Sequence, residues 1–186
     1  MKEPAEIKRL FAEIQKVTPH LDVLVSNAAS GVLKNALELS AKHWDWVMAT
    51  NARPLMLCAQ EAAKMMTSGG RVISLSSVGS GRVIPGYAAV GVSKAAAEAI
   101  TRYLAVELAP RGITVNTVCA GAIDTDIWRM IPDGERLLGA AKSRTPAGDL
   151  VSAEAVADIV YFLASPAAQP IQGQIIVADG GYSLLA

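Results

Sequence analysis

The chain has few of the residues from which metal centres and disulfide frameworks are built. Its 186 residues include two cysteines and two histidines. Cys58 and Cys119 lie in separate apolar segments with no Cys-x-x-Cys pair, and His20 and His43 are far apart in the sequence. The sequence therefore predicts no metal site and no disulfide, and a reducing cytoplasmic compartment is the expected location.

An excess of charge and a long apolar run are also absent. The chain has 17 basic and 17 acidic residues, and no basic stripe suggests a nucleic-acid partner. The apolar runs are too short or too interrupted to predict a membrane span, and the amphipathic N-terminal stretch does not resemble a signal peptide. Apolar residues nevertheless make up 52% of the chain, enough for the core of a single domain over residues 1–186.

Helical and strand patterns alternate along the chain. The strand candidates are short and apolar on both faces, which is typical of buried parallel strands connected by right-handed crossovers. Pro54 falls inside the second predicted helix, where it would kink or split it. Helices are predicted at 4–17, 41–67, 88–109, around 134–142 and at 153–164, and strands at 21–27, 71–77, 113–121 and 174–181.

Small and polar residues lie at the carboxyl ends of the predicted strands. In a parallel α/β sheet, ligands bind beyond the carboxyl ends of the strands, so these residues are expected to converge on one crevice. They are Asn27-Ala28-Ala29, Ser76-Ser77, Ala120-Gly121 and Asp179-Gly180-Gly181.

The segment GYAAVGVSK places Tyr87 seven residues before Lys94. A phenol with a pKa of about 10 is a poor proton donor at neutral pH unless a nearby cation stabilises its anion. Residues i and i+7 of a helix lie roughly 10 Å apart, but Pro85-Gly86 would allow the tyrosine ring to lean back toward the strand ends. From the spacing alone, a surface tyrosine and an unrelated helix lysine are the commoner interpretation.

Five further features, in this order along the chain, resemble the short-chain dehydrogenase/reductase family. They are SNAAS at 26–30, TNARP at 50–54, Ser77 at a strand end, VNTVCAGAIDT at 115–125 and GQIIVADGG at 173–181. Most members of the family place tyrosine four residues before lysine, where this chain has Val90. The Tyr-x6-Lys spacing and Ala120-Gly121 resemble the enoyl-acyl-carrier-protein reductase branch instead. The segments KHWDW and AVGVSK are most similar to its NADPH-using form III.

This resemblance implies a reaction and a set of site residues. Nicotinamide would deliver hydride to a trans-2-enoyl thioester carried by acyl carrier protein or CoA, in fatty-acid synthesis. The implied cofactor is NADP(H), with NAD(H) not excluded. Tyr87 would donate to the enolate oxygen and Lys94 would hold the nicotinamide ribose. Ser77 would assist at the oxygen or simply cap its strand, and Asn51 would support Lys94 or simply pack inside its helix.

The resemblance also implies how the cofactor, the acyl chain and further subunits are bound. Asn27, Ala28 and Ala29 would border the adenosine ribose, and residues 126–148 would form a lid over the acyl chain or pack against the body. A homodimer or homotetramer would form through the helices at 41–67 and 88–109. The residues expected at the nicotinamide and its phosphate are Gly121, Ala122, Ile123 and Thr125, and the apolar lid residues are Trp128, Met130, Ile131, Leu137 and Leu138.

The family begins with a strand, a glycine-rich turn and a helix, and this sequence has no such segment. We expect a partial Rossmann-like doubly wound sheet, with about four strands of an expected seven and roughly 60 residues missing from the front. A start at an internal methionine is the favoured explanation, ahead of a truncated paralogue or a half supplied by another chain. Two other functions remain open: a carbonyl reductase or alcohol dehydrogenase of the same family, and a truncated non-catalytic interaction module.

Overall fold

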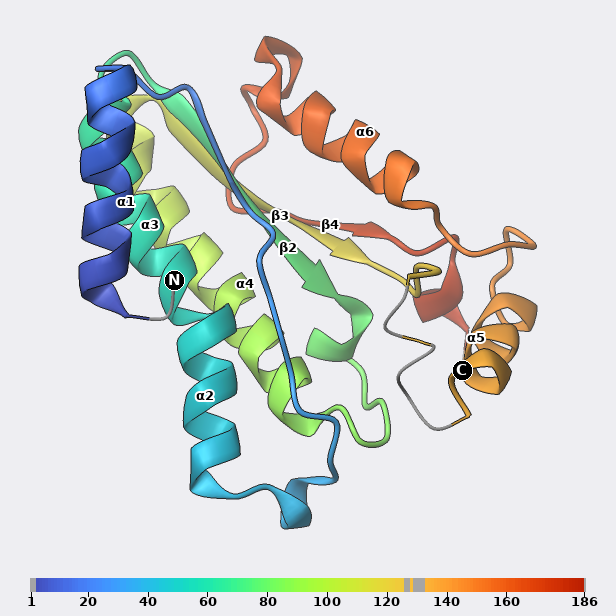
Figure 1. The fold of residues 1–186 in the computed structure, drawn as a ribbon. Coiled ribbons are helices and arrows are strands. Elements are labelled where there is room, and N and C mark those ends of the chain that lie inside the picture. The colour runs from blue at the N-terminus through green and yellow to red at the C-terminus, as the bar shows by residue number, and fades with distance from the viewer. Residues whose placement is uncertain (1–2, 126–127, 129–132, 186) are drawn as a thin grey trace.

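The fold is known from a computed structural model that describes residues 3–125, 128 and 133–185. The described residues form one sheet of four parallel strands in the order β1-β2-β3-β4 (Figure 1). All the carboxyl ends therefore meet at one edge of the sheet. The strands are β1 (Val23–Ser26), β2 (Gly70–Ser77), β3 (Ile113–Ala120) and β4 (Ile175–Ala178).

Helices cover both faces of this sheet (Figure 1). The helices are α1 (Pro4–Val17), α2 (Ala41–Asn51), α3 (Arg53–Met65), α4 (Ala88–Leu108), α5 (Gly134–Ser143) and α6 (Ala153–Ala164). The helices α1, α3 and α4 share an apolar core with Val72 and Val115 on one face. On the other face α6 packs with Ile73 and Val118. The predicted doubly wound α/β fold is confirmed, and none of the described helices has the length and hydropathy needed to cross a bilayer.

The structure contains the break predicted at Pro54, and it corrects the predicted end of the last strand. The helix expected over 41–67 is two helices that meet at Ala52. Pro54 has no N–H to donate to the carbonyl one turn earlier, which favours a break at this point. The last strand ends at Ala178 rather than at residue 181, because Gly180 and Gly181 adopt positive φ angles of 62° and 87° and turn the chain away from the sheet.

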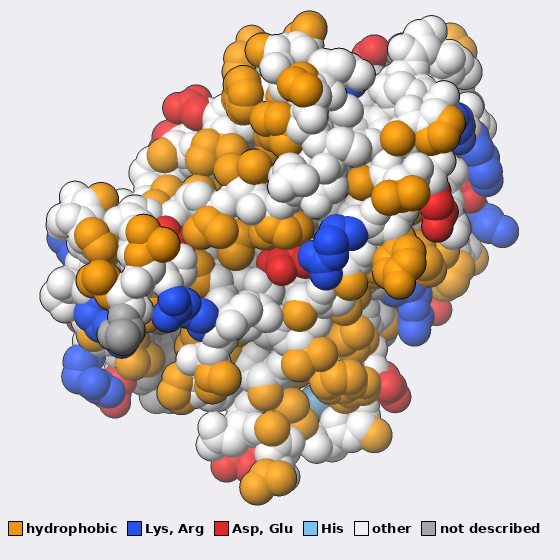
Figure 2. Space-filling model, turned by 180° about the vertical axis from the view of Figure 1, so that it is seen from behind, with side chains coloured by type: hydrophobic (Ala, Val, Ile, Leu, Met, Phe, Trp, Pro, Cys, Tyr) orange, Lys and Arg blue, Asp and Glu red, His pale blue; other side chains and the backbone are white. Residues whose placement is uncertain are grey.

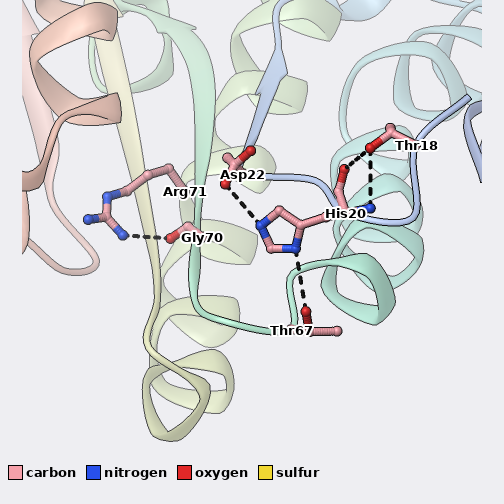
Figure 3. A network of polar contacts seen from close by, with 6 residues as sticks. All are labelled: Thr18, His20, Asp22, Thr67, Gly70 and Arg71. Atoms are coloured by element: carbon pink, nitrogen blue, oxygen red, sulfur yellow. Dashed lines mark hydrogen bonds and ion pairs between the residues drawn. The ribbon is translucent and has the colours of Figure 1, made fainter.

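A polar network joins the opposite, amino-terminal edge of the sheet (Figure 3). The His20 ring lies 2.9 Å from a carboxylate oxygen of Asp22 and 3.4 Å from the Thr67 hydroxyl. It thereby ties the chain entering β1 to the turn before β2. Arg71 donates to the Gly70 carbonyl at 2.9 Å on the same edge. These contacts hold the sheet together far from the carboxyl ends, where ligands of such folds bind.

Backbone packs directly on backbone where β2 leads into α4. The short turn Val78–Ser80 follows β2 and lies against the first turns of α4. A Cβ atom at Gly91 would come within 2.5 Å of the Gly79 carbonyl oxygen, and a Cβ atom at Gly79 would lie 2.7 Å from the Tyr87 ring. Both positions therefore need glycine for this close approach, which fixes the start of α4 against the end of β2.

This contact predicts that Gly91→Ala destabilises the protein. The added methyl group has to push the turn away from α4, and overpacking of this kind typically costs about 1–3 kcal/mol. Gly139→Ala is the matched control, because no atom lies within 4 Å of a Cβ placed there on α5, and alanine favours helix by up to about 1 kcal/mol. Urea denaturation followed by circular dichroism measures both variants. Equal stability of Gly91→Ala and the wild type would contradict the packing argument.

Candidate active site

Tyr87 immediately precedes α4, where its backbone forms the N-cap of the helix. Its ring lies over Gly79. Burial raises the pKa of the Tyr87 phenol, and a hydrogen bond with the Ser77 side chain opposes that rise. The Ser77 oxygen also accepts a hydrogen bond from the Gly79 N–H at 3.3 Å. The phenol and the Ser77 hydroxyl, which the sequence places ten positions apart, therefore meet beyond the carboxyl end of β2.

Lys94 reaches the same strand from the second turn of α4. Its ammonium group donates a hydrogen bond to the Leu75 carbonyl oxygen at 2.8 Å, two residues before Ser77. The side chain is half-buried, and desolvation by burial lowers the pKa of the Lys94 ammonium below its ordinary value. A cation, a phenol and a hydroxyl thus gather at the end of one strand, as a site for a developing negative charge requires.

Val90 occupies the position at which most members of the resembled family carry tyrosine. It is buried in a small core with Val47 and Ala89. A Cβ atom at Gly31 would lie 2.3 Å from a Val90 methyl carbon, so the loop after β1 presses directly on this side chain. Val90 therefore serves the packing of α4 against α2, and Tyr87 is the phenol that faces the strand end.

Asn51 is buried at the end of α2, and it clamps two elements together. Its amide oxygen accepts from the Ser30 N–H at 2.9 Å. Its amide nitrogen donates to the Ser30 carbonyl and to the Ser93 hydroxyl, both at 2.9 Å. The side chain thus joins the loop after β1 to the residue next to Lys94. Its hydrogen-bonding groups are occupied by these partners, so any support to Lys94 passes through Ser93 and the position of α4.

The residues predicted to border the cofactor follow β1 and β3, which lie on either side of β2. Asn27, Ala28 and Ala29 follow β1 and are exposed. Gly121 follows β3, and its N–H donates to the Ala178 carbonyl at 2.9 Å. Ala122 and Ile123 are partly buried and Thr125 is exposed. These residues share the carboxyl edge of the sheet with Tyr87 and Lys94, which is the placement the sequence predicted.

The predicted lid is described in part. The Trp128 indole donates to the Ile123 carbonyl at 2.8 Å, so its ring is tied to the end of the β3 loop. Leu137 and Leu138 lie in α5, which stands beyond the carboxyl ends of the strands (Figure 1). The predictions for Met130 and Ile131 lie outside the described residues.

Glu98 was not among the site residues that the sequence predicted. The Ser76 hydroxyl donates to a carboxylate oxygen of Glu98 at 2.5 Å. Burial, and then the charge of Glu98, raise the pKa of the neighbouring Cys119 thiol to about 11. Glu98 is four residues after Lys94 on α4, a spacing that places both on one helix face. That spacing was the available clue, but it does not identify Ser76 as the partner.

The family model described as "Enoyl-(Acyl carrier protein) reductase" matches residues 1–183. The 1-cyclohexenylcarbonyl-CoA reductase of Streptomyces collinus is 42% identical over 182 residues, which are 97% of this chain. The chain spans 65% of the length of that enzyme.

Solved structures show the same relationship. The Bacillus cereus enoyl-acyl carrier protein reductase, solved with NADP+ and an indole naphthyridinone, is 30% identical with a TM-score of 0.94, and the match covers 100% of this chain and 74% of that one. A variant of a Serratia marcescens short-chain dehydrogenase/reductase is 34% identical with a TM-score of 0.90, covering 98% and 74% of the two chains. The chain therefore belongs to the short-chain dehydrogenase/reductase family, and its fold and family model are those of the enoyl-acyl carrier protein reductases.

Proposed function

We propose that the protein carrying this chain uses NAD(P)H to reduce the conjugated double bond of a trans-2-enoyl thioester attached to acyl carrier protein or CoA. The observation that carries the proposal is the position of Tyr87, which lies beside Ser77 while Val90 is buried in the core. The relative from Streptomyces collinus adds support, because a 1-cyclohexenylcarbonyl thioester is itself a conjugated enoyl thioester.

The position of the phenol suits an enoyl group better than a ketone. In ketone reduction, the carbon that accepts hydride and the oxygen that becomes negative are joined by one bond. In enoyl reduction, three bonds separate the β-carbon that accepts hydride from the thioester oxygen. The donor must therefore reach farther from the hydride. Tyr87 lies three residues before Val90, which corresponds to about 4.5 Å along a helix axis.

The donors at the site fit the nicotinamide end of a dinucleotide. An ammonium group and a phenol, Lys94 and Tyr87, approach the end of β2 from one helix, and such donors suit the hydroxyl groups of a ribose. The described residues include no G-x-x-x-G-x-G or G-x-G-x-x-G sequence after a strand, so they lack the motif that forms the pyrophosphate cradle in this family. We assign Lys94, Gly121, Ala122, Ile123 and Thr125 to the nicotinamide end, and Asn27 to Ala29 to the adenosine ribose.

The chain's own residues then act on the charge that forms in the substrate. Bound NAD(P)H supplies the hydride. Tyr87 donates a hydrogen bond or a proton to the thioester oxygen as it becomes an enolate, and Ser77 orients the phenol. Lys94 holds the ribose and adds positive potential, which favours negative charge on the phenol oxygen and on the enolate. Trp128, Leu137 and Leu138 cover the acyl chain.

The proposal predicts that Tyr87→Phe lowers turnover of crotonyl thioester by about 10²–10³, the usual cost of losing one oxyanion donor. The affinity for NADPH should stay within a few-fold, because Lys94 is unchanged. Tyr161→Phe is the matched control, since that phenol is on α6 and is 79% exposed. Reduction is followed by loss of NADPH absorbance.

Acetoacetyl thioester, assayed beside crotonyl thioester, separates the competing functions. The proposal expects crotonyl thioester to be reduced and acetoacetyl thioester to be left unchanged. Turnover of the keto substrate alone would identify a carbonyl reductase. If millimolar NADPH left nicotinamide fluorescence unchanged, the protein would be a non-catalytic interaction module.

The buried ammonium also predicts how cofactor affinity depends on pH. Desolvation lowers the pKa of Lys94, so the ammonium loses its charge as pH rises through a value below that of an ordinary lysine. Burial raises the pKa of Tyr87, so the phenol keeps its proton over this range. The dissociation constant for NADPH, measured by fluorescence, should therefore rise on the alkaline side. Lys94→Met should bind weakly at every pH, and an unchanged affinity up to the pKa of an ordinary lysine would argue against the assignment.

We further propose that the protein forms a homodimer or homotetramer through α3 and α4. A groove between these helices is lined by Met56, Ile100, Tyr103 and Leu104, among other residues. Val106 on α4 is 77% exposed. The surface opposite to the view of Figure 1 carries hydrophobic side chains between charged ones (Figure 2). Burial of such side chains against a second copy would stabilise an oligomer.

Val106→Lys should shift the protein toward monomer, because a charge would be buried in the α3–α4 interface. Val83→Lys is the control, since Val83 is 97% exposed in the loop before α4 and the chemical change is the same. Light scattering coupled to size-exclusion chromatography measures the mass of each variant. A well-folded wild-type monomer would rule out the oligomer.

A further inference from the structure

We propose that Glu98 is a positioning residue for Lys94: held by Ser76 on β2, its carboxylate keeps the buried ammonium charged and in place. This role deepens the proposed function and rests on it for the use that catalysis makes of Lys94. It adds a residue to the four side chains that the sequence predicted at the reacting end of the site.

The first observation is the geometry of the carboxylate. Ser76 donates to a Glu98 oxygen at 2.5 Å, which is short enough for a charge-assisted hydrogen bond. Ser76 directly follows Leu75, whose carbonyl accepts the hydrogen bond from Lys94. Two adjacent residues of β2 therefore hold the two charged side chains of α4. Because Glu98 is one helical turn after Lys94, the pair is within the range at which i and i+4 side chains interact.

The second observation is that two neighbouring side chains, Cys119 and Glu98, favour the charged form of Lys94. Burial lowers the pKa of the Lys94 ammonium, while Cys119 on β3 and Glu98 on α4 raise it. Cys119 has its own pKa raised to about 11, so it is an uncharged thiol at pH 7. The Asp179 carboxylate, beyond β4, accepts from the N–H groups of Gly181 and Ser183 and is not among the groups that shift the pKa of Lys94.

The remaining elements around Lys94 bring no competing charge to it. At the start of α4, Tyr87 has a raised pKa and stays neutral. From α2, the uncharged Asn51 contacts Ser93. The turn after β2 contributes the Ser77 and Ser80 hydroxyls, of which Ser77 contacts Tyr87 and Ser80 contacts Cys119. The Glu98 carboxylate and the Leu75 carbonyl are therefore what oppose the desolvation of the ammonium.

The experiment measures the titration of Lys94 directly. The free protein is labelled with trace acetic anhydride from pH 6 to pH 11, and acetylation of each lysine is quantified by mass spectrometry. Only the unprotonated amine reacts, so the midpoint of labelling is the pKa of that lysine. Glu98→Gln, which keeps the shape of the side chain, should lower the Lys94 midpoint by about one pH unit. Acetylation of Lys94 near pH 7 should then rise about tenfold.

Two variants separate charge from packing. Glu107→Gln makes the same change at an exposed site on α4 and should leave the Lys94 midpoint unchanged. The labelling midpoint of Lys64 should be the same in every variant. Glu98→Asp keeps the charge, so the Lys94 midpoint in that variant should stay closer to the wild-type value than to the Glu98→Gln value. An unchanged midpoint in Glu98→Gln would overturn the proposal. A common shift in the Gln and Asp variants, with or without loss of helical circular dichroism, would also overturn it by assigning Glu98 to packing.

This readout uses neither cofactor nor substrate. If the protein reduced no enoyl thioester, the proposed function would fail while the labelling result would still decide the link between Glu98 and Lys94. If the reductase activity were present and the Lys94 midpoint did not move, only the role of Glu98 would fail. In an active enzyme, the alkaline loss of NADPH affinity should shift downward in Glu98→Gln by the same amount as the labelling midpoint.

Discussion

A cation withdrawn from water at the end of β2 is the constraint on which the proposed site depends. Burial disfavours the charged form of Lys94, yet its positive potential is what a phenol donor needs beside it. The protein resolves this conflict with a backbone carbonyl at 2.8 Å and a carboxylate one helical turn away. Both partners are fixed by the same strand, so the ammonium is held without a surface ion pair that solvent would screen.

The phenol depends on a different kind of contact, the close packing of two backbones. Gly79 and Gly91 let the turn after β2 lie directly on α4. That contact sets the distance between the strand that carries Ser77 and the helix that begins at Tyr87. Because protein interiors are close-packed, a methyl group placed there would move the donor itself. Stability and chemistry are therefore linked at this junction, as they are at the clamp that Asn51 makes on the loop after β1.

The fold could be predicted from the sequence because its strands are apolar on both faces and its helices have regular periodicity. The helix predicted at 4–17 was correct for this reason, since α1 spans Pro4–Val17. The end of β4 was predicted at residue 181 rather than at Ala178, although Gly180 and Gly181 are themselves a turn signal. The contact between Ser76 and Glu98 was out of reach, because the partner of a helix carboxylate on a distant strand depends on how α4 packs across β2.

The proposed preference for an enoyl group over a ketone depends on where the side chains of Tyr87 and Val90 are placed, and the two placements depend on each other. A tyrosine at position 90 would have to leave the pocket formed by Gly31 and Val47, where the small core now holds valine. A phenol at position 87 needs Gly79, because any larger residue would occupy the space of the ring. Exchanging one arrangement for the other therefore means changing the loop after β1, the turn after β2 and the helix together. Replacing Tyr87 alone would remove the phenol from its proposed place. Replacing Val90 by tyrosine alone would put a phenol where the pocket holds only valine.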